Sequence, residues 1–233
     1  MAFLHPGPSR QPAFNVPPVV MGVIGVFAAV QALRAWGPPA LADHLVDIFA
    51  LVPARLTQPG PLWDKAVPFV SYMALHGDWT HLAINCLWLL AFGPIVARRF
   101  GAPLFLLFFL VCGVIGAGLF LVFDWGGPEP VVGASAAISG LMGAGIRLLP
   151  GRFAWAQPGE APLMPLLSRP VLSFSAVWMV MNIVVGTLGL GMVPEGQSVA
   201  WQAHMGGYLA GLLLAGAFDR LRPRALAPSL DDS

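Results

Sequence analysis

Residues 100–123 form a run of 24 residues without a charged side chain. A helix needs about 20 apolar residues to cross the hydrocarbon core of a bilayer, so this run is long enough to do so. The rest of the chain has the same character, because 57% of its 233 residues are hydrophobic and only 10% are charged. An ordinary soluble domain carries roughly 25% charged residues. The sequence therefore predicts an all-α membrane protein with several spans.

Intervals without charged residues predict six membrane spans. Five cover residues 19–33, 79–97, 100–123, 130–146 and 171–190, and the sixth lies between Glu195 and Asp219. Residues 39–53 form another apolar segment, with Asp43 and Asp47 on the face opposite its large apolar side chains. This segment is a poor span, so we expect an interfacial helix within a long first outer loop. The prediction is a six-transmembrane-helix bundle over residues 19–220, with short tails at 1–18 and 221–233.

The positions of Lys and Arg predict how this bundle is oriented. If six spans put both termini on one side, the other side holds only Arg34, Arg55 and Lys65. Cytoplasmic loops carry the excess of basic residues. We therefore expect both termini in the cytoplasm. The basic residues then expected on the inner side are Arg10, Arg98, Arg99, Arg147, Arg152, Arg169, Arg220, Arg222 and Arg224.

Charge, cysteine content and the absence of repeats argue against several classes. A formal net charge of +1 does not supply the basic surface that nucleic-acid binding needs. Cys86 and Cys112 lie within apolar runs, so we interpret them as core residues rather than a disulfide or a metal pair. The sequence has no internal repeat, which weakens a transporter interpretation. Glycines inside the spans, among them Gly207 and Gly211, are expected to permit close helix packing.

Polar side chains are rare inside the predicted spans, and each is a functional candidate because burial in lipid is costly. They are His81 and Asn85 in the second span, Ser135 and Ser139 in the fourth, Asn182 in the fifth and His204 in the sixth. Each also has a structural explanation when taken alone. A serine can bond its own backbone, and a histidine with an asparagine can join two helices. Asn182 has no evident partner in the sequence.

The expected depth of these residues favours a shared site. At about 1.5 Å per helical residue, Asn85 lies about 10 Å below Asp78 and Ser135 about 9 Å below Glu129. His204 lies about 13 Å below Glu195 by the same measure. All three reference residues belong to the outer side of the predicted topology. The serine, the two histidines and Asn85 are therefore expected in one layer of the outer half of the bundle.

This set of side chains is typical of acyl transfer. A serine becomes a nucleophile when a base such as His204 accepts its proton, and the developing oxyanion needs hydrogen-bond donors. Ser135 offers its own N–H at the start of a helix, while His81 and Asn85 offer side-chain donors. No Asp or Glu lies in any span to orient His204, so the sequence predicts a Ser–His dyad rather than a triad. The His-Glu-x-x-His motif of zinc hydrolases is absent, and so is an intramembrane pair of acids.

Three segments resemble the rhomboid family of intramembrane serine proteases. They are HGDWTHLAIN at 76–85, GASA at 133–136 and AHMGG at 203–207, the last continuing to Gly211. The resemblance extends from about Tyr72 to Arg220. It implies Ser135 as nucleophile, His204 as base, and His81 and Asn85 as the oxyanion site, with His76, Gly133, Ala136, Gly207 and Gly211 as supporting residues.

The resemblance also implies a six-helix bundle whose first loop lies partly in the membrane. The implied substrates are transmembrane segments of membrane proteins, cut near the outer face after entry past the fifth span. With this resemblance we expect the protein in a bacterial plasma membrane. No metal or organic cofactor is implied, and the oligomeric state stays open. The alternative from another class is a catalytically inactive rhomboid-like protein that binds membrane-protein clients.

The sequence departs from the family's pattern at three places. The usual Gly-x-Ser-Gly has Ala136 in its last position, and the aromatic residue often found four residues after the nucleophile is Ser139. A Trp-Arg pair commonly found in the first loop is replaced by Val67 and Pro68. None of these changes removes a reacting group.

Overall fold

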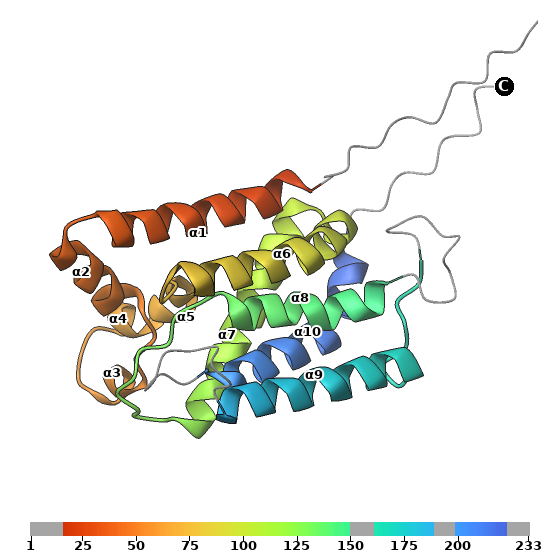
Figure 1. The fold of residues 1–233 in the computed structure, drawn as a ribbon. Helices are drawn as coiled ribbons and strands as arrows, with labels where there is room; N and C mark the ends of the chain where they lie inside the picture. The colour runs from red at the N-terminus through yellow and green to blue at the C-terminus, as the bar shows by residue number, and fades with distance from the viewer. Residues whose placement is uncertain (1–15, 150–160, 189–198, 223–233) are drawn as a thin grey trace, which may run out of the picture.

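The protein is described here by a computed structural model, which covers residues 16–149, 161–188 and 199–222. Over these residues the chain is helical and contains no strand. Six long helices follow one another in alternating directions and form the body of the molecule, with α8 between its neighbours (Figure 1). They are α1 (Pro18–Trp36), α6 (Trp79–Phe100), α7 (Ala102–Phe123), α8 (Ser135–Leu148), α9 (Arg169–Leu188) and α10 (Trp201–Leu221).

Four of these helices, α1, α6, α7 and α9, are long and apolar enough to cross a membrane. They correspond to the first, second, third and fifth predicted spans, which indicates a multi-pass membrane protein. Helix α8 has only 14 residues, and α10 is long enough but less apolar. The count of six spans therefore stays a prediction. Glu195, Arg10, Arg152, Arg224 and most of the two predicted tails lie outside the described residues.

Two predicted boundaries differ from the observed helix ends for local reasons. Phe100 ends α6 instead of opening the third span, because Gly101 follows with a φ of 76° that breaks the helix. The fourth helix begins at Ser135, five residues later than residue 130, where the predicted span starts. The intervening backbone is not helical, and Val131 pairs there with Leu51 through two hydrogen bonds of 2.8 and 3.1 Å. Ser135 is therefore the first residue of its helix.

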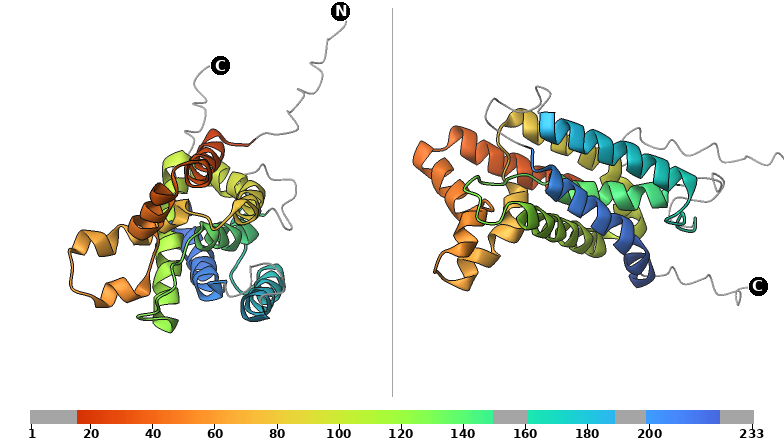
Figure 2. Two further views of the ribbon diagram at one scale, coloured as in Figure 1. Left: turned by 60° about the vertical axis from the view of Figure 1, so that its left-hand side comes forward. Right: turned by 90° about the horizontal axis from the view of Figure 1, so that it is seen from below.

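Four short helices between α1 and α6 gather at one end of the bundle (Figures 1 and 2). They are α2 (Pro39–Phe49), α3 (Pro53–Thr57), α4 (Leu62–Ala66) and α5 (Pro68–Ser71), followed by the 3-10 turn η1 (Tyr72–Ala74). Helix α2 lies where an interfacial helix is predicted, and Asp43 and Asp47 are exposed on it. It ends before residue 53 because the chain becomes extended to reach the Leu51–Val131 pairing.

The backbones of α8 and α10 touch through glycine. A methyl group at Gly207 would overlap the carbonyl oxygen of Ala136, and one at Gly211 would overlap the carbonyl oxygen of Gly140. Only glycine fits at both positions, so the close packing predicted for these residues is confirmed. Cys112 is buried in the same core and Cys86 is half-buried; both are free thiols.

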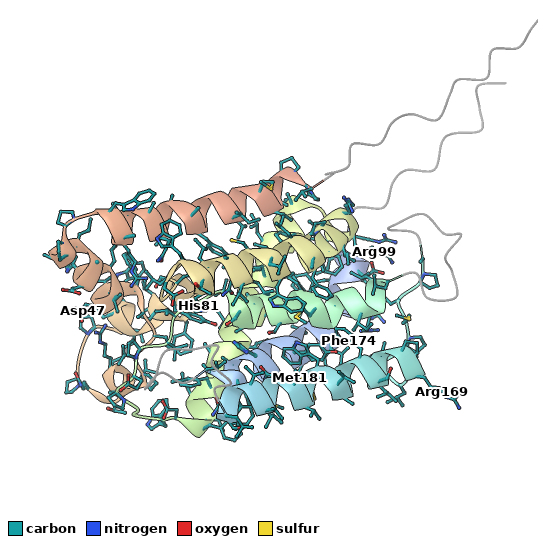
Figure 3. The ribbon with its side chains drawn as sticks, in the orientation of Figure 1. Asp47, His81, Arg99, Arg169, Phe174 and Met181 are labelled. Atoms are coloured by element: carbon teal, nitrogen blue, oxygen red, sulfur yellow. The ribbon has the colours of Figure 1, made fainter. Side chains whose placement is uncertain are left out.

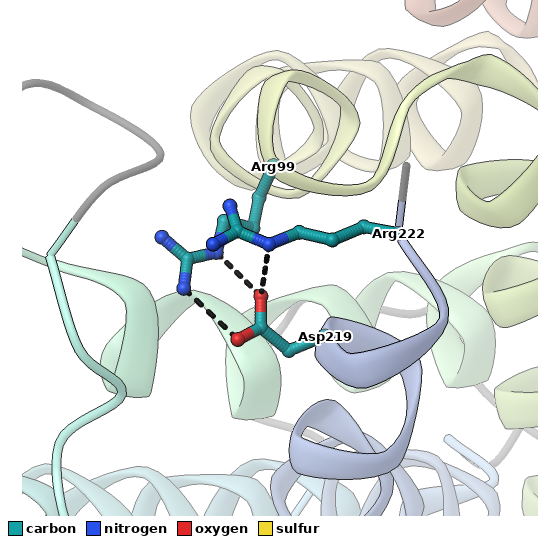
Figure 4. Close-up of polar contacts among 3 residues, drawn as sticks. All are labelled: Arg99, Asp219 and Arg222. Carbon is teal, nitrogen blue, oxygen red and sulfur yellow. Dashed lines mark hydrogen bonds and ion pairs between the residues drawn. The ribbon is translucent and has the colours of Figure 1, made fainter. Parts of the chain in front are cut away.

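An ion pair joins α6 to α10 (Figure 4), and Figure 3 shows its Arg99 at the end of the bundle opposite the short helices. Arg99 Nε lies 2.5 Å from Asp219 Oδ1, and its Nη2 donates to Oδ2 at 2.9 Å. Arg222 Nε lies 3.3 Å from the same carboxylate. Arg99 is nearly fully buried, so this bidentate ion pair fixes α6 relative to α10.

Candidate active site

Ser135 and His204 meet across the contact between α8 and α10. Ser135 Oγ lies 2.7 Å from His204 Nε2, although the two residues are 69 positions apart in the chain. Both side chains are partly buried, and Ser135 is the first residue of α8. The first N–H groups of a helix have no partner within it. The backbone N–H of Ser135 is therefore available beside its own hydroxyl group.

The second ring nitrogen of His204 is also hydrogen-bonded, which the sequence does not predict. His204 Nδ1 lies 2.9 Å from Asn182 Oδ1, and Asn182 Nδ2 donates to the carbonyl oxygen of Trp201 at 2.9 Å. Asn182 therefore has a partner that the sequence does not reveal, and His204 is oriented although no acid is available for that role. An amide oxygen accepts the same hydrogen bond as a carboxylate oxygen.

His81 lies beside Ser135 because Gly133 has no side chain. Gly133 adopts a φ of 118°, and a Cβ on it would lie 2.9 Å from His81 Nε2 and 3.8 Å from Ser135 Oγ. The Gly77 N–H donates to His81 Nδ1 at 3.3 Å. Because Nδ1 accepts, the proton of the neutral ring is on Nε2, the nitrogen that faces Gly133. Figure 3 shows His81 at the end of α6 that adjoins the start of α8.

His81 is held in place by the residues just before α6. Asp78 caps the helix, because its Oδ1 accepts from the His81 N–H at 2.8 Å. The His76 ring is fully buried, and its centroid lies 5.3 Å from that of His81 and 5.1 Å from that of Phe27. Arg34 of α1 donates to the carbonyl oxygen of His76. His76 therefore packs between His81 and the core residue Phe27.

Asn85 lies one turn below His81 and is almost fully buried. Its Nδ2 donates to the His81 carbonyl oxygen at 2.9 Å, and its Oδ1 has no partner among the described residues. One hydrogen of the amide nitrogen is thus used within α6 and the second is not. Asn85 thus lies beside His81 within α6, and the described residues show no direct bond between it and Ser135.

The first loop is anchored without the Trp-Arg pair. The Gly133 N–H donates to the Tyr72 carbonyl oxygen at 3.0 Å, and the Tyr72 hydroxyl donates to the Gly113 carbonyl oxygen at 2.9 Å. Ser71 Oγ, just after the segment at Val67 and Pro68, donates to the Phe49 carbonyl oxygen at 2.9 Å. These bonds connect the loop to α2, to α7 and to the backbone that leads into Ser135.

The two departures within α8 face the core. Ala136 is 1% exposed, and its Cβ points at Gly116 of α7 rather than at the serine hydroxyl group. Ser139 is also buried, one turn further along α8. His204 is instead hydrogen-bonded to the amide oxygen of Asn182, which reaches it from α9.

The family described as Rhomboid domain matches residues 62–220. RHOMBOID-like protein 5 of Arabidopsis thaliana is 28% identical over 76% of this chain and 52% of its own length. Rhomboid protease GluP of Bacillus subtilis is 29% identical over 82% of this chain and 34% of its own length.

A third relative, the chloroplastic Rhomboid-like protein 11 of Arabidopsis thaliana, is 29% identical over 75% of this chain and 59% of its own length. The chain thus spans between one third and three fifths of the length of these relatives. The family match covers well over half of the chain. It includes the four helices that carry Ser135, His204, His81 and Asn182. By this match, and with Ser135, His204 and His81 gathered at one end of its helical bundle, the chain belongs to the rhomboid family.

Proposed function

We propose that the protein is an intramembrane serine endopeptidase with Ser135 as nucleophile and His204 as general base. The observation that carries this proposal is the 2.7 Å separation of Ser135 Oγ and His204 Nε2. That distance lies within the range needed for a base to take the proton of a nucleophile. The name of the Bacillus subtilis relative, a rhomboid protease, agrees with this chemistry.

The proposed reaction is acyl transfer in two steps. Ser135 Oγ bonds to the carbonyl carbon of the peptide while its proton moves to His204 Nε2, which then gives the proton to the leaving amine. Water then gives one proton to His204 Nε2 while its oxygen bonds to the acyl carbon. The ester bond to Ser135 Oγ breaks, the proton returns from His204 to Oγ, and the product leaves with a new carboxyl end. No other reactant is needed.

The proposed oxyanion site consists of the Ser135 N–H, His81 and Asn85. It is supported by the assignment of the His81 proton to Nε2, which faces Gly133 and Ser135. Removal of one such donor typically costs about 10²–10³ in rate. His76 and Gly133 have supporting roles, because one packs against His81 and the other leaves room for it.

The proposed substrates are transmembrane segments of other membrane proteins, cut near the outer face of a bacterial plasma membrane. The proposed transmembrane domain covers residues 19–220, with six spans and both termini in the cytoplasm. The distribution of basic residues supports this orientation. Arg98, Arg147, Arg169 and Arg220 lie at one end of their helices, whereas the site lies at the other.

The test is cleavage of a reference transmembrane substrate by the purified protein in liposomes. Wild-type protein is expected to cut the substrate, and Ser135→Ala and His204→Ala are expected to be inert while keeping the wild-type thermal transition. Turnover by Ser135→Ala at a rate close to wild type would refute the serine-protease mechanism. An inert wild type would favour the client-binding alternative.

A further inference from the structure

Three hydrogen bonds in series connect α9, α10 and α8 at the proposed active site. Asn182 Nδ2 donates to the Trp201 carbonyl oxygen, and Asn182 Oδ1 lies 2.9 Å from His204 Nδ1. His204 Nε2 lies 2.7 Å from Ser135 Oγ. Because the amide nitrogen is engaged by a carbonyl group, the amide oxygen is the atom that faces His204. That oxygen can only accept a hydrogen bond.

This series assigns the proton of the neutral imidazole. Nδ1 must carry the hydrogen in order to donate to Asn182, so Nε2 keeps its lone pair toward the serine hydroxyl group. We infer that Asn182 is a positioning residue that completes a Ser–His–Asn triad with Ser135 and His204. The inference rests on the proposed function, since it needs Ser135 to be the nucleophile.

The chemistry of the proton transfer explains why an amide suits this position. When Ser135 Oγ attacks, its proton moves to His204 Nε2 and both ring nitrogens then carry hydrogen. The bond from Nδ1 to Asn182 Oδ1 becomes charge-assisted and strengthens at that moment. An asparagine supplies the acceptor without placing an ionised carboxylate within the membrane, where charge is costly. Asparagine also holds the histidine in the Cys–His–Asn proteases.

Helix α9 provides a matched control for this role. It is otherwise weakly buried, with only Val171 and Ser175 buried among its described residues. Ser175 lies seven residues before Asn182, which is two turns along the same face, and its hydroxyl lies 2.7 Å from that of Tyr208. Ser175 thus bonds α9 to α10 as Asn182 does, but without contacting His204. Its loss tests the docking of α9 alone.

The experiment measures the rate at which an alkyl fluorophosphonate labels Ser135. This reagent reacts when Ser135 Oγ bonds to phosphorus and fluoride leaves, so it needs the nucleophile and its base but no transmembrane substrate. Asn182→Leu keeps the side-chain volume and removes the acceptor, whereas Asn182→Asp keeps an acceptor oxygen. We expect Asn182→Leu to slow labelling at least about tenfold. A general base raises the rate about 10²–10⁴-fold, and a histidine without its partner loses part of that effect. Ser175→Ala should stay within severalfold of wild type. Asn182→Asp keeps the acceptor but loses the donor to Trp201, so it should label faster than Asn182→Leu.

Steady-state cleavage in liposomes gives a second readout. Asn182→Leu should lower kcat with little change in KM, because the substrate still enters and binds. If the leucine variant does not purify as a folded protein, Asn182→Ala removes the same acceptor from a smaller side chain and should show the same loss.

Each other outcome overturns the inference. Labelling of Asn182→Leu at the wild-type rate would show that His204 needs no partner at Nδ1. Equal losses in Asn182→Leu and Ser175→Ala would assign Asn182 to helix docking. A wild type that is not labelled at all would overturn the proposed function along with the inference, whereas the first two outcomes leave the proposed function intact.

Discussion

Gly207 of α10 lies against the carbonyl group of Ala136 in α8, so close that no side chain fits between them. Gly207 is three residues after His204, and Ala136 is the residue after Ser135. The contact therefore sets the separation of the two helices at the level where the proposed nucleophile and base meet. A change in this separation is transmitted directly to the 2.7 Å distance between Ser135 Oγ and His204 Nε2.

Gly207→Ala is expected to impair both stability and cleavage. The added methyl group must push α10 away from α8, and overpacking of this kind costs about 1–3 kcal/mol. Gly118→Ala is the matched control, because a methyl group at Gly118 of α7 meets no atom within 4 Å. Thermal unfolding in detergent and cleavage in liposomes should both fall for Gly207→Ala and stay near wild type for Gly118→Ala. Similar results for the two variants would contradict the close contact.

Ser135 and His204 are expected to act as one unit. Once either residue is gone, the other has no proton transfer to perform, so the effects of the two losses do not add. The double variant Ser135→Ala with His204→Ala should therefore have a residual rate within about threefold of each single variant. Multiplication of the two single effects in a cleavage assay would count against a shared step.

The sequence predicts most of the site because polar residues are conspicuous in an apolar chain. Ser135, His81 and His204 stand out on that ground alone, and their helices are recognisable as charge-free runs. Two features are not predictable in this way. The start of α8 depends on the pairing of Leu51 with Val131, which joins distant parts of the chain.

The partner of Asn182 is the second feature. Which face of α9 meets α10 depends on how the helices pack, and the sequence of α9 marks that face only weakly. The two polar residues Ser175 and Asn182, seven positions apart, are the feature of the sequence that indicates this face. An isolated asparagine in a span is also compatible with simple helix association. Its contact with His204 depends on how α9 packs against α10, which the sequence alone does not determine.

The proposed orientation predicts opposite labelling at two exposed leucines. Leu62 in the first loop and Leu167 before α9 are 80% and 83% exposed, so single cysteines there are equally accessible. In a Cys86→Ala background, a membrane-impermeant maleimide should label Leu62→Cys in intact cells. It should label Leu167→Cys only after the cells are opened. The reverse pattern would put the proposed active site on the cytoplasmic side.

His76 is expected to make stability depend on pH. Burial, with the nearby His81 and Arg34, lowers the pKa of His76 to about 4 from its ordinary 6.5. The unfolded chain then binds more protons than the folded one between these values, so stability falls as pH drops below about 6.5 and levels off near 4. The loss from pH 7 to pH 5 is on the order of 1–2 kcal/mol.

The measurement is thermal unfolding at pH 7 and pH 5 for wild type and His76→Phe. Phenylalanine keeps a ring against Phe27 and removes the titrating group. The difference between the two pH values should be smaller in His76→Phe than in wild type. An equal difference in both proteins would assign the acid sensitivity to other groups.

Ala136→Gly tests whether the departure next to the nucleophile affects the chemistry. The Ala136 methyl group points at Gly116 in the core, and the reacting N–H belongs to Ser135 itself. Its removal should leave the cleavage rate within about tenfold of wild type, a change of at most 1.36 kcal/mol in barrier. Stability should fall by about 1 kcal/mol, because glycine is a poorer helix former than alanine and leaves a small gap beside α7. Cleavage and thermal unfolding of the same preparations check both numbers. If the wild type is inert and Ala136→Gly is active, the methyl group blocks the site, and the natural protein is the client-binding relative rather than a protease.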